Sequence, residues 1–148
     1  MRLQFVGFGN VAKNLIMLIH EKKKQLESLG IPLKIVSISD SRGTVIDKKG
    51  LNLLRVLKSK DSNWNDSSHY ILGCSAFAAI QNVEGDVVVE LTPSTLSGEP
   101  GLSNIKAALI QKKNVVTANK GPLVVAFEEL TKLSERNNVL FRYEATDR

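Results

Sequence analysis

A glycine-rich turn joins the first apolar segment of the chain to its first amphipathic segment. Residues 3–6 read LQFV, and GFGNVA follows at residues 7–12. In this G-x-G-x-x-A pattern Gly7 permits a tight turn, Gly9 lets the backbone approach a phosphate, and Ala12 allows a helix to pack closely on a sheet. A helix that begins here presents free amide groups and the positive end of its dipole. A strand before the glycines and an amphipathic helix after them favour dinucleotide binding over an ordinary structural turn. The predicted pyrophosphate contacts are Gly7, Phe8, Gly9, Asn10, Val11 and Ala12.

The rest of the chain alternates between apolar and amphipathic segments. Strand character is found at residues 3–6, 33–39, 87–91, 115–117 and 139–143. Apolar residues at helical spacing predict helices at residues 10–28, 51–60, 74–80, 102–113 and 123–137. Strands that alternate with helices indicate βαβ units, so the expected fold is α/β: a Rossmann-type, doubly wound, mostly parallel sheet with helices on both faces. Residues 59–68 are expected to form a polar loop.

Composition excludes several other classes of protein. Hydrophobic residues make up 43% of the chain and charged residues 24%, so neither disorder nor a fibrous structure is indicated. The net charge is +5, but the lysines form short groups, at residues 22–24, 48–49 and 112–113, and aromatic residues are only 5%. We interpret these lysines as solvated helix surface with a minor role in attracting an anionic ligand. No nucleic-acid partner is expected.

Cysteine usage and apolar run lengths indicate the compartment. Cys74 is the only cysteine, so no disulfide can form within the chain, and a reducing, cytoplasmic setting fits. No apolar stretch approaches the length that spans a bilayer, and the start of the chain resembles a strand rather than a signal peptide. No membrane partner is therefore expected.

The second strand ends in IVSISDSRG, where a dinucleotide-binding fold contacts the adenosine ribose. Asp40 can accept hydrogen bonds from the ribose hydroxyls, which favours NAD. Arg42 can instead pair with the 2′-phosphate of NADP, with help from Lys58. An ordinary Asp-Ser-Arg-Gly turn is the alternative. Asp40, Ser41 and Arg42 are the predicted contacts, and NAD and NADP both remain open.

Several longer motifs resemble the homoserine dehydrogenases. They are ELTP at residues 90–93, VVTANKGP at residues 115–122 and YEAT at residues 143–146, and GFGNVA and SISDSRG are similar as well. The resemblance implies that residues 1–148 are the NAD(P)-binding domain of an oxidoreductase that interconverts L-homoserine and L-aspartate 4-semialdehyde. This reaction belongs to threonine, methionine and isoleucine biosynthesis. In that family a second α+β domain provides dimerisation and most contacts to the small-molecule substrate.

The resemblance also implies roles for residues at the reacting end of the site. Lys120 matches the family lysine beside the nicotinamide and the substrate carbonyl, where a cation can polarise the aldehyde oxygen or stabilise an alkoxide. Thr92 and Pro93 match positions that line the nicotinamide side, Thr92 through its hydroxyl and backbone groups. Asn119 is expected to orient Lys120 or to touch the cofactor. Glu144 matches a position that contributes to a sodium site.

The printed sequence ends at residue 148, whereas the family continues from EAT into a glycine-rich segment that completes the sodium site. In the family, the proton-donating lysine and the acidic residues that hold the amino group of homoserine lie in the second domain. We therefore expect the 148 residues to bind dinucleotide and to turn over homoserine slowly or not at all. A stand-alone, non-catalytic NAD(P)-binding or regulatory module is the alternative. A homodimer, or disorder near residues 144–148, is expected because an uncovered last strand exposes apolar surface.

Overall fold

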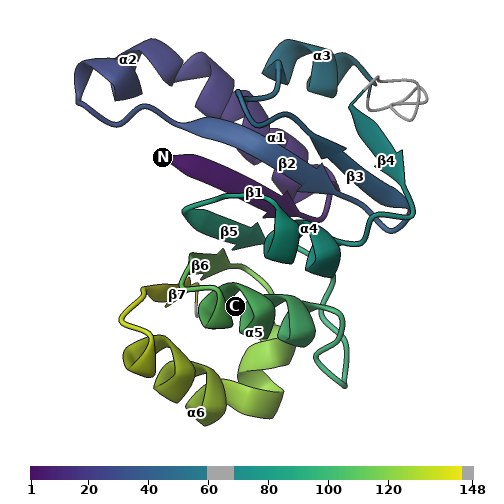
Figure 1. Cartoon of the computed structure of the whole chain (residues 1–148), viewed down its shortest axis with the longest axis vertical. Coiled ribbons are helices and arrows are strands. Elements are labelled where there is room, and N and C mark those ends of the chain that lie inside the picture. The colour runs from purple at the N-terminus through teal and green to yellow at the C-terminus, as the bar shows by residue number, and fades with distance from the viewer. Residues whose placement is uncertain (60–68, 145–148) are drawn as a thin grey trace.

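The strands form one sheet with the order β4-β3-β2-β1-β5-β6-β7, and helices cover both of its faces (Figure 1). The structure, a computed structural model, describes residues 1–59 and 69–144. Five neighbouring strands are parallel, which confirms the expected Rossmann-type fold. They are β2 (Lys34–Ser39), β1 (Arg2–Val6), β5 (Val87–Glu90), β6 (Asn114–Thr117) and β7 (Phe141–Tyr143), and all five were predicted.

Two further strands were not predicted. β3 (Gly43–Ile46) pairs antiparallel with β2, and β4 (Tyr70–Leu72) pairs antiparallel with β3. With four and three residues, these strands are too short to show a clear alternation of apolar and polar side chains. The predicted polar loop at residues 59–68 lies, apart from Ser59, outside the described residues.

The helices follow the predicted order with shifted ends. The single helix expected at residues 10–28 is two helices, separated at Lys22. The last helix begins at Lys120 instead of residue 123, because the side chain of Asn119 caps it by accepting a hydrogen bond from the amide of Gly121. None of the helices in the described part of the chain is long and apolar enough to cross a membrane. The helices are α1 (Asn10–Glu21), α2 (Lys23–Ser28), α3 (Leu53–Lys58), α4 (Ala76–Asn82), α5 (Gly101–Ile110) and α6 (Lys120–Arg136).

Two apolar cores lie on opposite sides of the sheet. Successive side chains of a strand point to opposite faces, so Val89 packs with Ile16 of α1, whereas Val88 packs with Leu130 of α6. All four residues of β5 are buried. This two-sided burial agrees with the continuous run of valines, which is typical of a strand covered on both faces.

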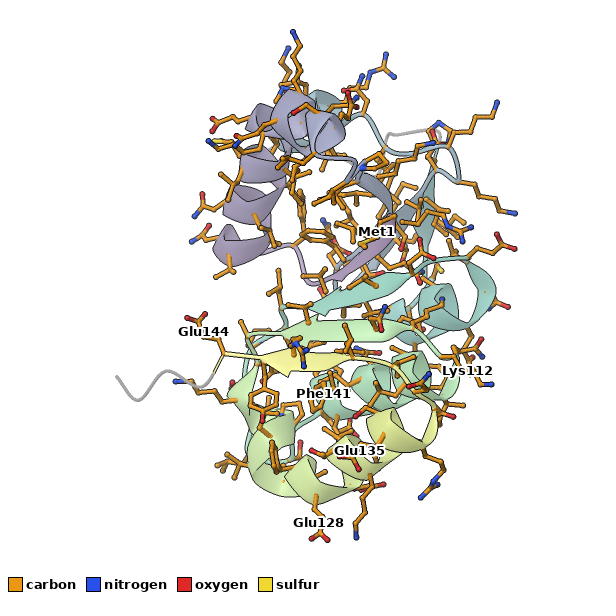
Figure 2. The ribbon with its side chains drawn as sticks, turned by 90° about the vertical axis from the view of Figure 1, so that its left-hand side faces the viewer. Met1, Lys112, Glu128, Glu135, Phe141 and Glu144 are labelled. Carbon is orange, nitrogen blue, oxygen red and sulfur yellow. The ribbon has the colours of Figure 1, made fainter. Side chains whose placement is uncertain are left out.

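One row of the sheet register fixes where the parallel strands end. The residues of this row, paired from strand to strand, are Ser39, Val6, Glu90, Thr117 and Tyr143. Residues that follow the row therefore emerge along one edge of the sheet, where open α/β sheets bind ligands. Figure 2 shows Glu144 at this edge and Lys112 at the opposite end of the strands.

Lys113 is not the solvated lysine that the sequence predicted. Lys113 is only 7% exposed to solvent. The ammonium group donates to Gln4 Oε1 at 2.6 Å, to the carbonyl of Val83 at 2.8 Å, and to the carbonyl of Ile80. These carbonyls belong to the end of α4, where a cation complements the helix dipole. Burial, and next the nearby charge of Arg2, lower the pKa of Lys113.

Replacement of Lys113 should destabilise the fold through the carbonyls at the end of α4. Lys113→Met leaves these buried acceptors without a donor, so we expect a loss of about 1–3 kcal/mol in the free energy of unfolding. Lys112→Met, at the exposed neighbouring position, is the control and should change stability little. Urea unfolding of both variants measures the difference, and equal effects would contradict this role of Lys113.

The contribution of Lys113 should also depend on pH. Its native pKa lies below the ordinary value of 10.5, so between these two values the unfolded chain binds more protons than the native chain. Stability from this group therefore rises as the pH increases toward 10.5, and it is constant below the native pKa. The stability gap between wild type and Lys113→Met should widen on the alkaline side. A gap that narrows there would show that the sign is wrong.

Candidate functional site

A groove of ≈ 930 Å³ opens at the carboxyl ends of β1, β2 and β5. In the sheet, β2 lies on one side of β1 and β5 lies on the other. The groove therefore lies at the point where the strand order reverses. A smaller cavity of ≈ 400 Å³, beside α1, α2 and the start of β2, contains none of the predicted site residues. The predicted residues in the groove wall are Gly7, Phe8, Asp40, Ser41, Thr92 and Pro93.

The two glycines of the turn after β1 meet different surroundings. Gly7 has a φ of +102°, and a Cβ atom there would lie 2.9 Å from the carbonyl oxygen of Leu91. The fold itself therefore requires glycine at this position. Gly9 has a φ of −87°, and a Cβ atom there would meet no heavy atom of the described residues within 4 Å. The space in front of Gly9 is open to a close-approaching ligand.

The first turn of α1 lies directly after these glycines. Among the described residues no side chain caps its first amide groups, and residues 10–11 are exposed. Ala12 is buried at 1% exposure, as close packing of the helix on the sheet requires. The ammonium group of Lys13 lies 5.2 Å from the centre of the Phe8 ring, so a positive charge stands beside the groove wall. Lys13 was not among the residues predicted from the sequence to form the site.

Asp40 closes the turn between β2 and β3. Its Oδ1 accepts hydrogen bonds from the amides of Arg42 at 2.8 Å and Gly43 at 2.9 Å. Its Oδ2 lies 4.0 Å from the guanidinium group of Arg42, whose side chain is exposed. The turn weighed as the alternative is therefore present, yet Asp40 also lines the groove. Burial, and next the charge of Asp40, raise the pKa of Tyr70 in β4.

Thr92 follows β5, and its polar groups point toward other side chains of the protein. Its amide and its hydroxyl both donate to the carboxylate of Glu90, the amide at 2.9 Å. The same hydroxyl oxygen accepts from the side-chain amide of Asn119 at 3.1 Å. The hydroxyl expected to face a ligand is thus already engaged on both sides, while Pro93 is exposed on the groove wall.

Lys120 is the first residue of α6, and Asn119 fixes the start of this helix. Asn119 is 3% exposed. Its Oδ1 accepts from the amide of Gly121 at 3.0 Å and from the hydroxyl of Ser94 at 2.9 Å. The hydroxyl of Ser94 accepts in turn from the amide of Lys120 at 3.1 Å. Asn119 and Ser94 thus hold the backbone at the start of α6.

The remaining predicted residues are not part of the described groove wall. Glu144 is exposed at the end of β7, and residues 145–148 lie outside the described ranges. Within those ranges no three or more His, Cys, Asp or Glu residues lie close enough together to hold a metal ion. The predicted residues outside the wall are Gly9, Asn10, Val11, Ala12, Arg42, Asn119, Lys120 and Glu144.

A second wall of the groove, at the starts of α4 and α5, was not predicted from the sequence. Ser75 accepts a hydrogen bond from the amide of Ala78, so it caps α4, and a serine before an apolar run is a recognisable cap signal. The carboxylate of Glu99 accepts from the amide and the hydroxyl of Ser103, at 3.0 and 2.8 Å. The missed wall residues are Ser75, Ala76, Phe77, Glu99, Pro100, Ser103 and Asn104.

The sequence of this chain is similar to those of known proteins. The family model described as homoserine dehydrogenase, NAD binding domain, matches residues 7–144. The chain is 38% identical to a homoserine dehydrogenase of Methanocaldococcus jannaschii, over 99% of this chain and 44% of that protein. It is 36% identical to an NAD(+)-dependent homoserine dehydrogenase of Pseudomonas canavaninivorans, over 98% of this chain and 43% of that protein.

Solved structures show the same similarity. Homoserine dehydrogenase from Thermoplasma acidophilum superposes with a TM-score of 0.82 at 26% identity, over 98% of this chain and 43% of that chain. A hyperthermophilic archaeal homoserine dehydrogenase in complex with NADPH gives a TM-score of 0.82 at 27% identity, over 97% and 43%. The chain thus spans less than half the length of these relatives.

The two glycines of the turn should respond differently to the same substitution. Gly7→Ala forces a Cβ atom against Leu91 at a positive φ, so we expect a loss of about 1–3 kcal/mol in the free energy of unfolding. Gly9→Ala adds a methyl group in open space at a negative φ, and its stability should match wild type. Urea unfolding tests both variants, and an unchanged Gly7→Ala would contradict the steric account.

Proposed function

The chain belongs to the homoserine dehydrogenase family, and we propose that its groove binds NAD or NADP for the interconversion of L-homoserine and L-aspartate 4-semialdehyde. The observation that carries this proposal is the turn after β1. Gly7 shapes the turn, and the space before Gly9 at the uncapped start of α1 is open. Backbone amides at a helix start, approachable without side-chain obstruction, suit a pyrophosphate.

The adenosine end of the cofactor belongs beside the turn that Asp40 closes. Oδ1 of Asp40 is held by two backbone amides, so its carboxylate is fixed where ribose hydroxyls can donate to it. Ser41 shares this wall, and the exposed guanidinium of Arg42 can pair with a 2′-phosphate. Relatives support either cofactor, since one is NAD(+)-dependent and another was solved with NADPH.

The reacting end of the cofactor belongs beside Thr92, Pro93 and Lys120. The bound nicotinamide supplies or accepts the hydride. The ammonium group of Lys120 polarises the semialdehyde oxygen, or stabilises the alkoxide when the reaction runs in reverse. Asn119 and Ser94 hold the backbone from which Lys120 projects. The homoserine and semialdehyde substrates and any dimer partner are inferred from the family as a whole.

Calorimetric titration with NAD and with NADP tests cofactor binding. Wild type should bind at least one of them, and Gly9→Val should weaken that binding at least about tenfold because its side chain fills the pyrophosphate approach. Met17→Val changes an exposed residue of the same helix and is the control. Binding that is unchanged in Gly9→Val would move the phosphates away from α1, and no binding by wild type would overturn the proposal.

Arg42→Ala identifies the preferred cofactor in the same titration. If Arg42 contacts the 2′-phosphate, the substitution weakens NADP by about tenfold or more and leaves NAD nearly unchanged, because a charge-assisted contact is lost only with the phosphate. Lys58→Ala, at an exposed position of α3, is the companion variant because Lys58 is predicted to assist Arg42. Equal loss of NAD and NADP affinity in Arg42→Ala would assign this arginine to the turn that Asp40 closes, with no role in selecting the phosphate.

Turnover by the 148 residues tests the division of labour in catalysis. The family resemblance assigns the proton donor and the homoserine amino-group ligands to a second domain, so we expect binding with slow or no oxidation of homoserine. Absorbance at the reduced-nicotinamide band follows the reaction, with a full-length homoserine dehydrogenase as positive control. Rapid turnover that Lys120→Met abolishes would show that these residues contain the complete acid–base machinery.

A further inference from the structure

A buried carboxylate lies behind the reacting end of the groove. Glu90 ends β5 at 0% exposure, and among the described residues no salt bridge reaches it. Its side chain accepts hydrogen bonds from the amide and hydroxyl of Thr92. The hydroxyl of Thr117 donates to the Glu90 carbonyl at 2.9 Å and shares its proton with the carboxylate at 3.1 Å. A carboxylate is costly to bury unless such donors surround it.

The start of α5 abuts the same carboxylate. A Cβ atom on Gly101, the first residue of α5, would lie 3.0 Å from Glu90 Oε2 and 2.5 Å from Asn119 Nδ2. A residue larger than glycine would therefore collide with both side chains. The positive end of the helix dipole is thereby brought against the negative charge of Glu90, in place of a cationic side chain.

Hydrogen bonds continue from Glu90 toward Lys120. The hydroxyl proton of Thr92 is directed at Glu90, so its oxygen is left to accept from the amide group of Asn119 at 3.1 Å. This fixes which way the Asn119 side chain is turned and directs its oxygen to the amide of Gly121. The hydroxyl of Ser94 donates to the same oxygen and accepts from the backbone of Lys120.

We propose that Glu90 is a positioning residue: through Thr92, Asn119 and Ser94, its carboxylate aligns Lys120 and the nicotinamide side of the groove. The proposal rests on the cofactor site proposed above. Thr92, Asn119 and Ser94 each contribute both a donor and an acceptor, and an acceptor at position 90 gives every bond in this chain its direction. Glu90 touches neither cofactor nor substrate in this arrangement and acts through its neighbours.

The test compares two ligands that share the adenosine diphosphate part. One is the dinucleotide, NAD or NADP, that binds more tightly in the titration above, and the other is ADP. Glu90→Leu removes the acceptor at similar size and should weaken the dinucleotide about tenfold while ADP changes less than about twofold. Glu90→Gln keeps one acceptor oxygen and should restore part of the affinity. Ser94→Ala breaks only the last link and should act in the same direction more weakly.

Val88→Ala is the matched control, because Val88 lies on the same face of β5 and is fully buried without a part in these hydrogen bonds. It should lower stability and leave the ratio of the two affinities unchanged. Hydrogen exchange adds a readout without ligand: the amides of Lys120 and Gly121 should exchange faster in Glu90→Leu, relative to the interior of α6, and not in Val88→Ala.

Three results would overturn the positioning role. One is equal weakening of dinucleotide and ADP by Glu90→Leu, which indicates a purely structural carboxylate. Another is an unchanged dinucleotide affinity, even if amide exchange rises. A third is a Glu90→Gln variant no better than Glu90→Leu. In each case wild type still binds the dinucleotide, so the proposed function stands, whereas a wild type that binds neither ligand overturns both proposals together.

Discussion

The parallel register of β1, β5 and β6 is the constraint on which the rest of the structure depends. Val6, Glu90 and Thr117 lie in one row, so the glycine turn, Thr92 and Asn119 all emerge at the same edge of the sheet. A slip of β5 by one residue would turn Glu90 to the opposite face. The hydrogen bonds from its carboxylate to Thr92 and Thr117 would then be lost, and with them the connection between the ends of β5 and β6.

Much of this frame could be predicted from the sequence because the physical signals are local. The valines of β5, the glycine turn and the amphipathic α1 are each recognisable within a few neighbouring residues. β3 and β4 were missed because each is short and owes its strand conformation to the strand that it pairs with. The early start of α6 at Lys120 was also missed, although Asn119 two residues before Gly121 is a common helix cap.

The buried charges could not be predicted, because their partners are remote in sequence. In the sequence Lys113 stands in a pair of lysines that were interpreted as solvated surface, yet its ammonium group donates to Gln4, 109 residues away, and to the end of α4. Glu90 looks like the polar end of an apolar strand, and Thr117 lies 27 residues further on. Only the folded chain brings these donors and acceptors together. The residues of the second groove wall, such as Glu99, have local hydrogen bonds. They were missed because only the fold brings the starts of α4 and α5 beside the ends of β1, β2 and β5.

Lys113 and Glu90 are buried charges at opposite ends of the parallel strands, and both are compensated in the same way. The cation lies at the carboxyl end of α4 and the anion at the amino end of α5, so each charge meets the helix end of opposite sign. Neither has a salt-bridge partner among the described residues. Compensation by helix ends and neutral donors allows Glu90 to organise hydroxyl and amide groups without drawing a basic side chain into the interior. Lys120 can thus join the same network through its backbone amide while its side chain stays exposed.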